Sequence, residues 1–288
     1  MPAAVRWLFL PVLVVMAVSA CSGDNYQDVL RTLLEKERLV EETRVNLLLA
    51  AEAEKNAVLS TTEDAATKYA DQVRTAMGKA KAGLARLTML AARTHAQKEA
   101  QLLTRITNAF GEIESVDATI LGMAGRNTNL RAALLSRTEA AKTVNQLRQA
   151  LAPVISGPDC QAADQALQVE AASLSILAMH AQHIEESSNT AMDVLEASMT
   201  QENQQAQAGL DRLGKMLSPK EPAVAEARKA YDALWKITQE VLSLSRENSN
   251  INALALTMGR QRQLMAAALD DLAGLKTLVE AQDFKATR

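Results

Sequence analysis

The chain has 288 residues, with 31 Lys and Arg against 34 Asp and Glu, so its formal net charge is -3. This weakly acidic balance argues against a surface that binds nucleic acid or anionic lipid. Only 3% of the residues are aromatic, while Ala, Leu, Gln, Glu, Lys and Arg are abundant, a composition typical of long helices. We expect an almost wholly α-helical protein.

Residues 1–20 form a predicted secretion signal. Arg6 is followed by an apolar run, Trp7 to Val18, that is too short to span a membrane comfortably. The next residues, Val18-Ser19-Ala20-Cys21, resemble the lipobox of bacterial lipoproteins. The resemblance implies that Cys21 becomes an acylated N-terminus, which would hold the protein on a membrane. The alternative is an ordinary signal peptide with a cysteine near its end.

The residue after the cysteine bears on the predicted location. It is Ser22, where many lipoproteins retained at the inner membrane have Asp. This difference predicts the periplasmic face of the outer membrane, and the alternative is the outer leaflet of the inner membrane. Cys160 is then the one thiol left after acylation, and it either stays free or pairs with another chain.

Prolines and capping residues divide the rest of the chain. The prolines after residue 21 occur as two pairs, Pro153 with Pro158 and Pro219 with Pro222. Turn signals lie at 60–64, 92–94, 125–128, 187–190, 217–220 and 248–250. They predict four helices in each half of the chain. We therefore predict two tandem antiparallel four-helix bundles, 21–152 and 159–288, with a joint at 153–158.

The two halves repeat one another. The stretch 127–136, NTNLRAALLS, returns 121 positions later as NSNINALALT, and Phe110 matches Tyr231 at the same offset. Gly83 matches Gly209 at an offset of 126, so the halves differ in length between their second and third helices. The repeat indicates two copies of one unit, which would form a rod if stacked end to end. The alternative to a hinge at the joint is one long helix running through both bundles.

A heptad seam is clearest in the last segment, where positions three and four apart are mostly apolar. The seam residues are Ile251, Leu254, Met258, Gln261, Met265, Ala268, Leu272, Leu275 and Val279. The 121-residue offset places Arg137 at the position of Met258, and therefore on the seam of the first copy.

Three stretches resemble the four-helix-bundle sensor domains of bacterial chemoreceptors, and the tandem arrangement is similar to helical bimodular sensor domains. They are Ala53-Glu54-Lys55-Asn56, Ala230-Tyr231-Asp232-Ala233-Leu234-Trp235 and Ser249-Asn250-Ile251-Asn252-Ala253. The resemblance implies a module that binds a small solute or a protein and passes on a helix displacement. It also implies a homodimer, which Cys160 could crosslink. The second membrane helix and signalling region of those receptors have no counterpart here, so we expect an envelope or signalling protein to receive the signal.

Candidate ligand residues are polar side chains predicted near the seam. The guanidinium groups of Arg137 and Arg44 suit a carboxylate, so a small anionic solute is the expected ligand, unless both side chains point into solvent. The repeated asparagines form polar layers, line a ligand pocket or cap helices. They are Asn127, Asn129, Asn248 and Asn250.

No pattern predicts a metal site, a cofactor or catalysis. His180 and His183 share a helix face without a third ligand nearby, and we expect both at the surface. Glu54 is expected on an exposed helix face with its charged neighbours. The sequence shows neither a nucleophile elbow nor a Gly-rich phosphate loop.

The predicted function is therefore a lipid-anchored extracytoplasmic sensor-like protein that binds a solute or a protein partner and relays the event by contact. The alternative is a structural or scaffolding envelope lipoprotein that serves as a spacer or an assembly surface. A sensor should have charged groups inside a bundle, whereas a spacer should have a seam filled by Leu, Ala and Met.

Overall fold

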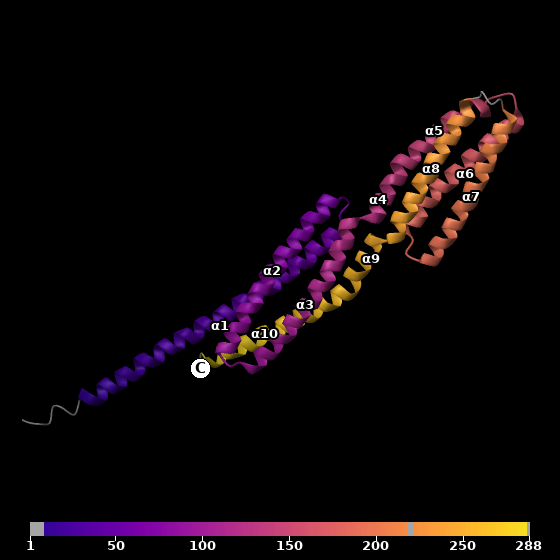
Figure 1. Ribbon diagram of the computed structural model, residues 1–288. Helices are drawn as coiled ribbons and strands as arrows, with labels where there is room; N and C mark the ends of the chain where they lie inside the picture. Colours follow the sequence, from indigo (N-terminus) through magenta and orange to yellow (C-terminus); the bar gives the residue numbers. More distant parts are fainter. Residues whose placement is uncertain (1–8, 218–221, 287–288) are drawn as a thin grey trace, which may run out of the picture. The chain divides into compact units, whose positions relative to one another are not determined.

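The computed structural model describes residues 9–217 and 222–286, and over these residues the protein is all-α, as predicted (Figure 1). Two short π-helical turns, η1 and η2, interrupt the α-helices. In chain order the elements are α1 (Phe9–Val58), α2 (Glu63–Arg93), α3 (Gln97–Arg126), α4 (Thr128–Leu135), η1 (Ser136–Ala140), α5 (Ala141–Ile155), α6 (Cys160–Glu185), α7 (Asn189–Met216), α8 (Pro222–Glu247), α9 (Ser249–Leu256), η2 (Thr257–Gln261) and α10 (Arg262–Ala286).

Most helix ends lie where capping residues and prolines predict them. The Asp159 side chain accepts hydrogen bonds from the first backbone N–H groups of α6, and Ser188 caps α7 in the same way. Pro222 is the first residue of α8, where its missing N–H group costs no helical hydrogen bond. The predicted turn at 217–220 lies mostly outside the described residues.

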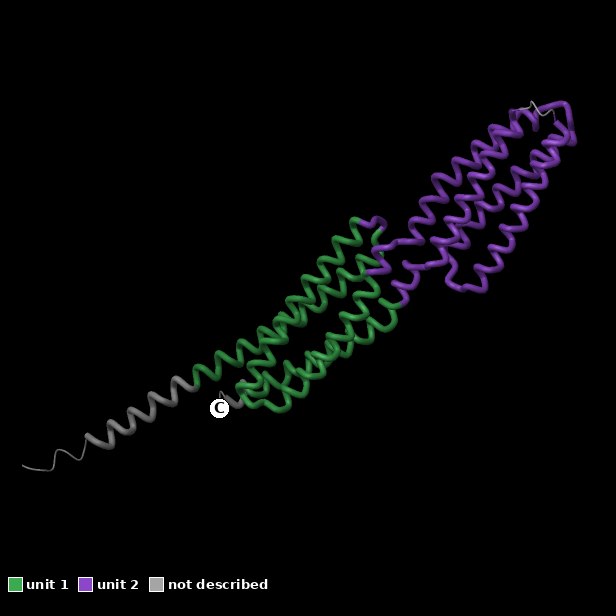
Figure 2. The backbone as a smooth tube through the Cα atoms, viewed as in Figure 1, with its two compact units in different colours: residues 1–60, 64–121, 256–288 green, residues 61–63, 122–255 purple. Residues whose placement is uncertain are grey.

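The chain folds into two compact units, which Figure 2 shows in separate colours. Unit 1 comprises 1–60, 64–121 and 256–288, and unit 2 comprises 61–63 and 122–255. In unit 1, α1, α2, α3 and α10 surround a core of Leu, Ala, Ile and Met side chains. In unit 2, the run from α4 to α5 packs with α6, α7 and α8 around a second core. Each unit is a four-helix bundle.

The predicted boundary between the bundles is wrong. The segment 153–158 was expected to be a joint, but Pro153 lies in the last turn of α5 and α6 begins at Cys160. The side chains on both sides, Leu151 and Ala162, belong to the same core in unit 2. The segment is therefore a tight turn inside unit 2, and the bundles are not consecutive in the sequence.

The true connections are the two repeated segments. A single residue, Asn127, separates α3 from α4, and a single residue, Asn248, separates α8 from α9. One residue is too short for a turn that returns the next helix to the bundle it came from. As a result α5 packs against α6 and α8 in unit 2, while α10 packs against α1 in unit 1. Each sequence repeat thus gives its fourth helix to the other unit.

Positions matched by the repeat have the same role in both units. Phe110 and Tyr231 are core residues that are 2% and 0% exposed. Gly83 and Gly209 mark points where helices approach closely, because an added Cβ would lie 2.5 Å from Thr43 Oγ1 or 2.6 Å from Val169 Cγ2. The offset of 126 therefore holds for α1 with α6 and for α2 with α7, and the offset of 121 holds for the later helices.

The predicted seam of the last segment is correct only from Gln261 onward. Residues from Met265 to Val279 are buried where the heptads place them, but Leu254 is 44% and Met258 56% exposed. The reason is η2, because a π-helical turn adds a residue to the helix and rotates the residues before it to another face. Turn η1 has the same effect in the first repeat.

Candidate functional site

The repeated segments meet in a polar cluster inside unit 2, which we call the junction cluster (Asn127, Thr128, Asn129, Asn248, Ser249 and Asn250). Asn127 and Asn248 have φ of 47° and 49°, the left-handed conformation that Asn tolerates best after Gly. The Thr128 backbone N–H donates to Ser249 Oγ at 3.0 Å, and the Ser249 N–H donates to Thr128 Oγ1 at 3.2 Å. The two helix starts therefore cap each other.

The four asparagines predicted as ligand residues all lie in this cluster, and their amides largely bind one another. Asn250 donates to Asn127 Oδ1 at 2.6 Å, and Asn129 donates to Asn248 Oδ1 at 2.8 Å. Asn129 and Asn248 also donate to the carbonyls of Ile184 and Glu186 at the end of α6. Asn127 Nδ2 is buried without a partner. The cluster holds the junction together by hydrogen bonds between helix ends.

The two arginines predicted to bind a ligand lie outside the cores. Arg137 is exposed, and its guanidinium donates only to the carbonyl of Ala133, one turn earlier. Turn η1 places Ser136 and Ala140 inward instead, so the seam position predicted for Arg137 is wrong. Arg44 is also exposed and pairs with Glu41 at 3.1 Å. Both therefore follow the solvent-facing alternative.

Each π-helical turn carries a polar side chain into the core of its unit. In unit 2, His180 of α6 contacts Ser136 of η1 through one ring nitrogen and Thr238 of α8 through the other, and we call these three residues the histidine cluster. His180 and Thr238 are 0% exposed. Thr238 Oγ1 donates to Leu234 O at 2.9 Å, so it accepts from His180 Nε2 at 3.1 Å, and Ser136 Oγ donates to Nδ1 at 3.0 Å. Every polar atom of this cluster has a partner.

Unit 1 has an acidic cluster at the equivalent positions. The repeat pairs Ser136 with Thr257, His180 with Glu54 and Thr238 with Asp117, and it adds Gln261 where unit 2 has Ala140. Thr257 Oγ1 donates to Glu54 Oε1 at 2.7 Å, and Gln261 Nε2 donates to Asp117 Oδ1. Glu54, Asp117 and Gln261 are 1%, 6% and 3% exposed. We call these four residues the acid cluster.

Burial shifts the pKa values of Asp117 and His180 in opposite directions. It raises the pKa of the Asp117 carboxyl group to about 9, and the negative charge of Glu54 acts in the same direction. The Asp117 carboxyl group is therefore neutral at pH 7. Burial lowers the pKa of His180 to about 4, with a smaller contribution from His183, so the imidazole stays neutral.

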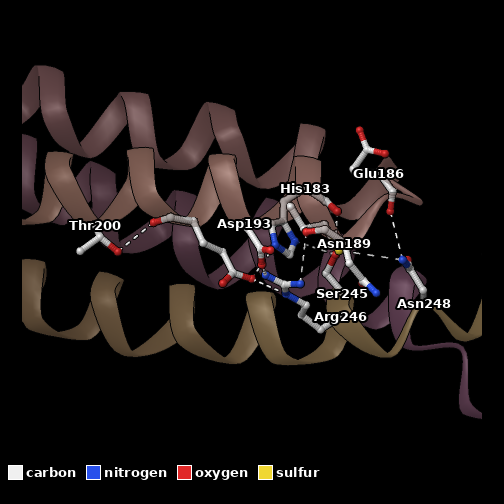
Figure 3. Close-up of polar contacts among 10 residues, drawn as sticks. His183, Glu186, Asn189, Asp193, Thr200, Ser245, Arg246 and Asn248 are labelled. Carbon is white, nitrogen blue, oxygen red and sulfur yellow. Dashed lines mark hydrogen bonds and ion pairs between the residues drawn. The ribbon is translucent and has the colours of Figure 1, made fainter.

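Unit 2 has a second polar network around His183, drawn in Figure 3. His183 Nδ1 lies 2.9 Å from Ser245 Oγ, and Nε2 lies 2.9 Å from Glu196 Oε1. Arg246 donates to the same Glu196 oxygen at 2.6 Å and also pairs with Asp193. The Arg246 hydrogen bond, followed by that of His183, lowers the pKa of Glu196. This network connects α6, α7 and α8 beside the junction cluster.

Unit 1 also contains a buried ion pair. Lys36 Nζ lies 2.8 Å from Glu99 Oε2, and the two side chains are 1% and 2% exposed. Lys36 donates to Thr94 Oγ1 at 3.0 Å, and Glu99 Oε1 accepts from Gln282 at 2.6 Å. Because both charged groups are paired and hydrogen-bonded, we interpret this ion pair as part of the fold and not as a ligand site.

A surface groove of about 910 Å³ lies between α1 and α2 of unit 1. Its lining carries both signs of charge, so it shows no preference for an anion. The lining includes Glu52, Asn56, Asp64, Lys68, Tyr69, Asp71 and Lys79.

The sequence-based prediction placed three buried polar residues at the surface. Glu54, His180 and His183 were expected at the surface, and all three are buried. A signal was present, because the repeat pairs Glu54 with His180 and Asp117 with Thr238, so polar residues recur at matched seam positions. Residue type alone nevertheless favours the surface for these side chains, because their burial depends on hydrogen-bond partners from other helices.

Other predictions lie beyond what the structure tests. The side chain of Cys21 is outside the described ones, so acylation of this residue stays a prediction. Cys160 is a free, exposed thiol. Among the described residues, no helix has the length and apolar character needed to cross a bilayer. Over the same part of the chain, no group of three or more His, Cys, Asp or Glu is placed to hold a metal ion.

Comparisons of the chain with protein-family models, with curated proteins and with solved structures return no match. The function is therefore argued from the geometry of the two units.

Proposed function

We propose that the protein is a lipid-anchored, extracytoplasmic sensor-like module, without catalysis, that binds a solute or ion inside its helical units and relays binding by contact to a protein partner. The observation that carries this proposal is the pair of polar clusters at equivalent π-helical turns, deep in cores that are otherwise apolar. Turns of this kind occur frequently at functional sites.

The buried polar groups favour this function over a spacer. A spacer needs only an apolar seam, and each buried polar or charged group adds a desolvation cost that the fold must offset. Both units nevertheless bury such groups, and in unit 1 two acids lie side by side. The sequence adds support through the lipobox-like Val18-Ser19-Ala20-Cys21 and the resemblance to chemoreceptor sensor domains.

The location of the buried groups changes the expected ligand. An anion would need a cation inside the bundle, but Arg44 and Arg137 face solvent and Lys36 is already paired with Glu99. The acid cluster instead favours a positively charged ligand in unit 1.

The predicted homodimer and its Cys160 crosslink stay predictions. Comparing the mass of Cys160→Ser with that of the parent chain under non-reducing conditions would test them.

A thermal-shift screen tests the proposal on the full-length chain in a non-ionic detergent, with amino acids, organic acids, amines and salts of inorganic ions. A ligand at about 100 times its Kd adds about 2.7 kcal/mol, enough to raise Tm by several degrees. We expect the shift to fall in Asp117→Asn or in Thr238→Val, according to the unit that binds, and to persist in the exposed control Arg137→Ala. No shift across the panel would favour the spacer.

A further inference from the structure

We propose that the acid cluster of unit 1 is a binding site for a hard divalent cation such as Ca²⁺. Four side chains from three elements converge there, with Glu54 from α1, Asp117 from α3, and Thr257 and Gln261 from η2. All of their free ligand atoms are oxygens. Carboxylate, amide and hydroxyl oxygens are the ligands that Ca²⁺ and Mg²⁺ prefer.

Two oxygens of the cluster have no hydrogen-bond partner. Glu54 Oε2 and Gln261 Oε1 are both buried and unpartnered, although the amide of Gln261 already touches Asp117. Gln261 is only 3% exposed, so water does not reach its carbonyl oxygen freely. A buried acceptor left without a partner is costly, and a bound cation would satisfy both oxygens at once.

The equivalent cluster of unit 2 shows that this scaffold does not need acids. There, His180, Thr238 and Ser136 close the same space with neutral groups, and each polar atom has a partner. The small side chain of Ala140 replaces Gln261. The acidic residues of unit 1 are therefore not required to fill the core, and a ligand of positive charge gives them a role.

A cation would offset the repulsion between the two acids. Glu54 and Asp117 lie close enough for the negative charge of Glu54 to act on the Asp117 carboxyl group. A divalent cation near both groups would be attracted to each of them. Because Thr257 and Gln261 belong to η2, a bound cation would also contact this turn, which leads into α10.

This inference rests on the proposed function and names the ligand class of one of its two polar clusters. The test is isothermal titration of the full-length chain, in non-ionic detergent and freed of metal by a chelator, with CaCl₂ and separately with MgCl₂. Extracellular calcium modules bind at about 10⁻⁴–10⁻³ M, so a titration to about 10 mM covers the range. We expect binding of one ion per chain and a Tm that rises with the cation.

Matched variants decide whether the ion binds at this cluster. Glu54→Gln and Asp117→Asn should each abolish the heat and the Tm rise, whereas Glu112→Gln should keep both, because Glu112 is an exposed acid on the same helix as Asp117. Removing a carboxyl group from a crowded pair should not unfold the chain, and the circular dichroism melt in chelator checks this point.

The possible outcomes separate this inference from the proposed function. Binding of either ion that both site variants lose supports the inference. Absence of heat and Tm change in the parent chain, or binding that Glu54→Gln retains, overturns it. If another member of the ligand panel still raises Tm, the proposed function stands without the cation site, and if none does, both fall.

Discussion

The two units differ in the polar residues that they bury at matched positions of the repeat. At one set of repeat-matched positions, unit 1 places two carboxyl groups and unit 2 places an imidazole and a hydroxyl. The histidine cluster is fully hydrogen-bonded, while the acid cluster leaves Glu54 Oε2 and Gln261 Oε1 unpartnered. The comparison shows that each π-helical turn brings one polar side chain, Ser136 or Gln261, into the core, while the neighbouring helices supply acids in unit 1 and neutral groups in unit 2.

Each unit also has buried or partly buried polar residues where the other unit has small residues. His183, Glu196 and Arg246 of unit 2 correspond by the repeat to Ala57, Ala70 and Gly125, which are small. Conversely, buried Lys36 of unit 1 corresponds to Ala162. Each unit therefore carries one polar group of residues that its counterpart lacks, and these are the places to test whether the units act differently.

The largest expected effect is at the ion pair that only unit 1 has. Glu99→Ala should lower the free energy of unfolding by about 3–5 kcal/mol, because it leaves the Lys36 ammonium buried without its counter-charge. Denaturant unfolding of the full-length chain measures this loss. The control is Glu42→Ala, which removes the exposed partner of Arg38 and should cost no more than about 1 kcal/mol. Equal losses would show that the Lys36–Glu99 pair is not formed.

The close helix contacts shared by both units should respond alike. Gly83→Ala and Gly209→Ala should each lower the unfolding free energy by about 1–3 kcal/mol, because Thr43 and Val169 are stiff β-branched residues that must move. Gly78→Ala has open space around it and should gain about 0.5–1 kcal/mol from helix propensity. A loss at only one of the two contact glycines would mean that the units do not pack equivalently.

Exchanging the matched aromatic residues Phe110 and Tyr231 tests whether the two cores differ in hydrogen bonding at this position. Tyr231→Phe should cost about 1 kcal/mol, since the Tyr231 hydroxyl donates to Asn203 at 2.9 Å. Phe110→Tyr should cost about 1–3 kcal/mol, because the counterpart of Asn203 in unit 1 is Met77 and the new hydroxyl has no acceptor there. A double-mutant cycle with Met77→Asn should give a favourable coupling energy, and zero coupling would contradict the matched geometry.

The pH dependence of stability should have opposite signs in the two clusters. The folded pKa of Asp117 is about 9 against an ordinary value of 3.8, so its contribution is fully present below about pH 4 and is lost as pH rises toward 9. The folded pKa of His180 is about 4 against 6.5, so its contribution is present above about pH 6.5 and is lost as pH falls toward 4. Each slope is at most about 1.4 kcal/mol per pH unit.

Unfolding curves in chelator, measured from pH 4 to pH 9, test these signs. Asp117→Asn should remove the fall in stability toward high pH, and His180→Gln should remove the rise above pH 4. The charged groups that act on Asp117 are Glu54 and Glu114, and the one that acts on His180 is His183. A falling slope that persists in Asp117→Asn would place its origin elsewhere.

Several features of the fold were predictable because their causes are local. The capping residue Ser188 and the proline at position 222 act within one turn of helix, and the helix ends follow them. The repeat was visible in NTNLRAALLS and NSNINALALT, and it correctly paired Phe110 with Tyr231 and Gly83 with Gly209. The repeat also singled out the four asparagines, which hydrogen-bond to one another in the structure.

The misplaced residues have two physical causes. Arg137 and Met258 were assigned to the seam by counting heptads, but the turns η1 and η2 shift the register within the helix. The same shift brings Ser136 inward, while Gln261 is buried as the seam predicts. Glu54 and His180 were assigned to the surface by residue type, and their burial depends on partners from other helices that no single segment reveals.

By itself, the sequence determined the all-α class, the helix ends and the twofold repeat, because composition, capping and periodicity act over neighbouring residues. Only the tertiary structure decided that α5 and α10 are exchanged between the units and that charged groups lie in the cores. The reason is that an apolar seam specifies which face of a helix is buried but not which bundle buries it. The single residues Asn127 and Asn248 make that choice, since each carries the chain on into the other unit without a reversing turn.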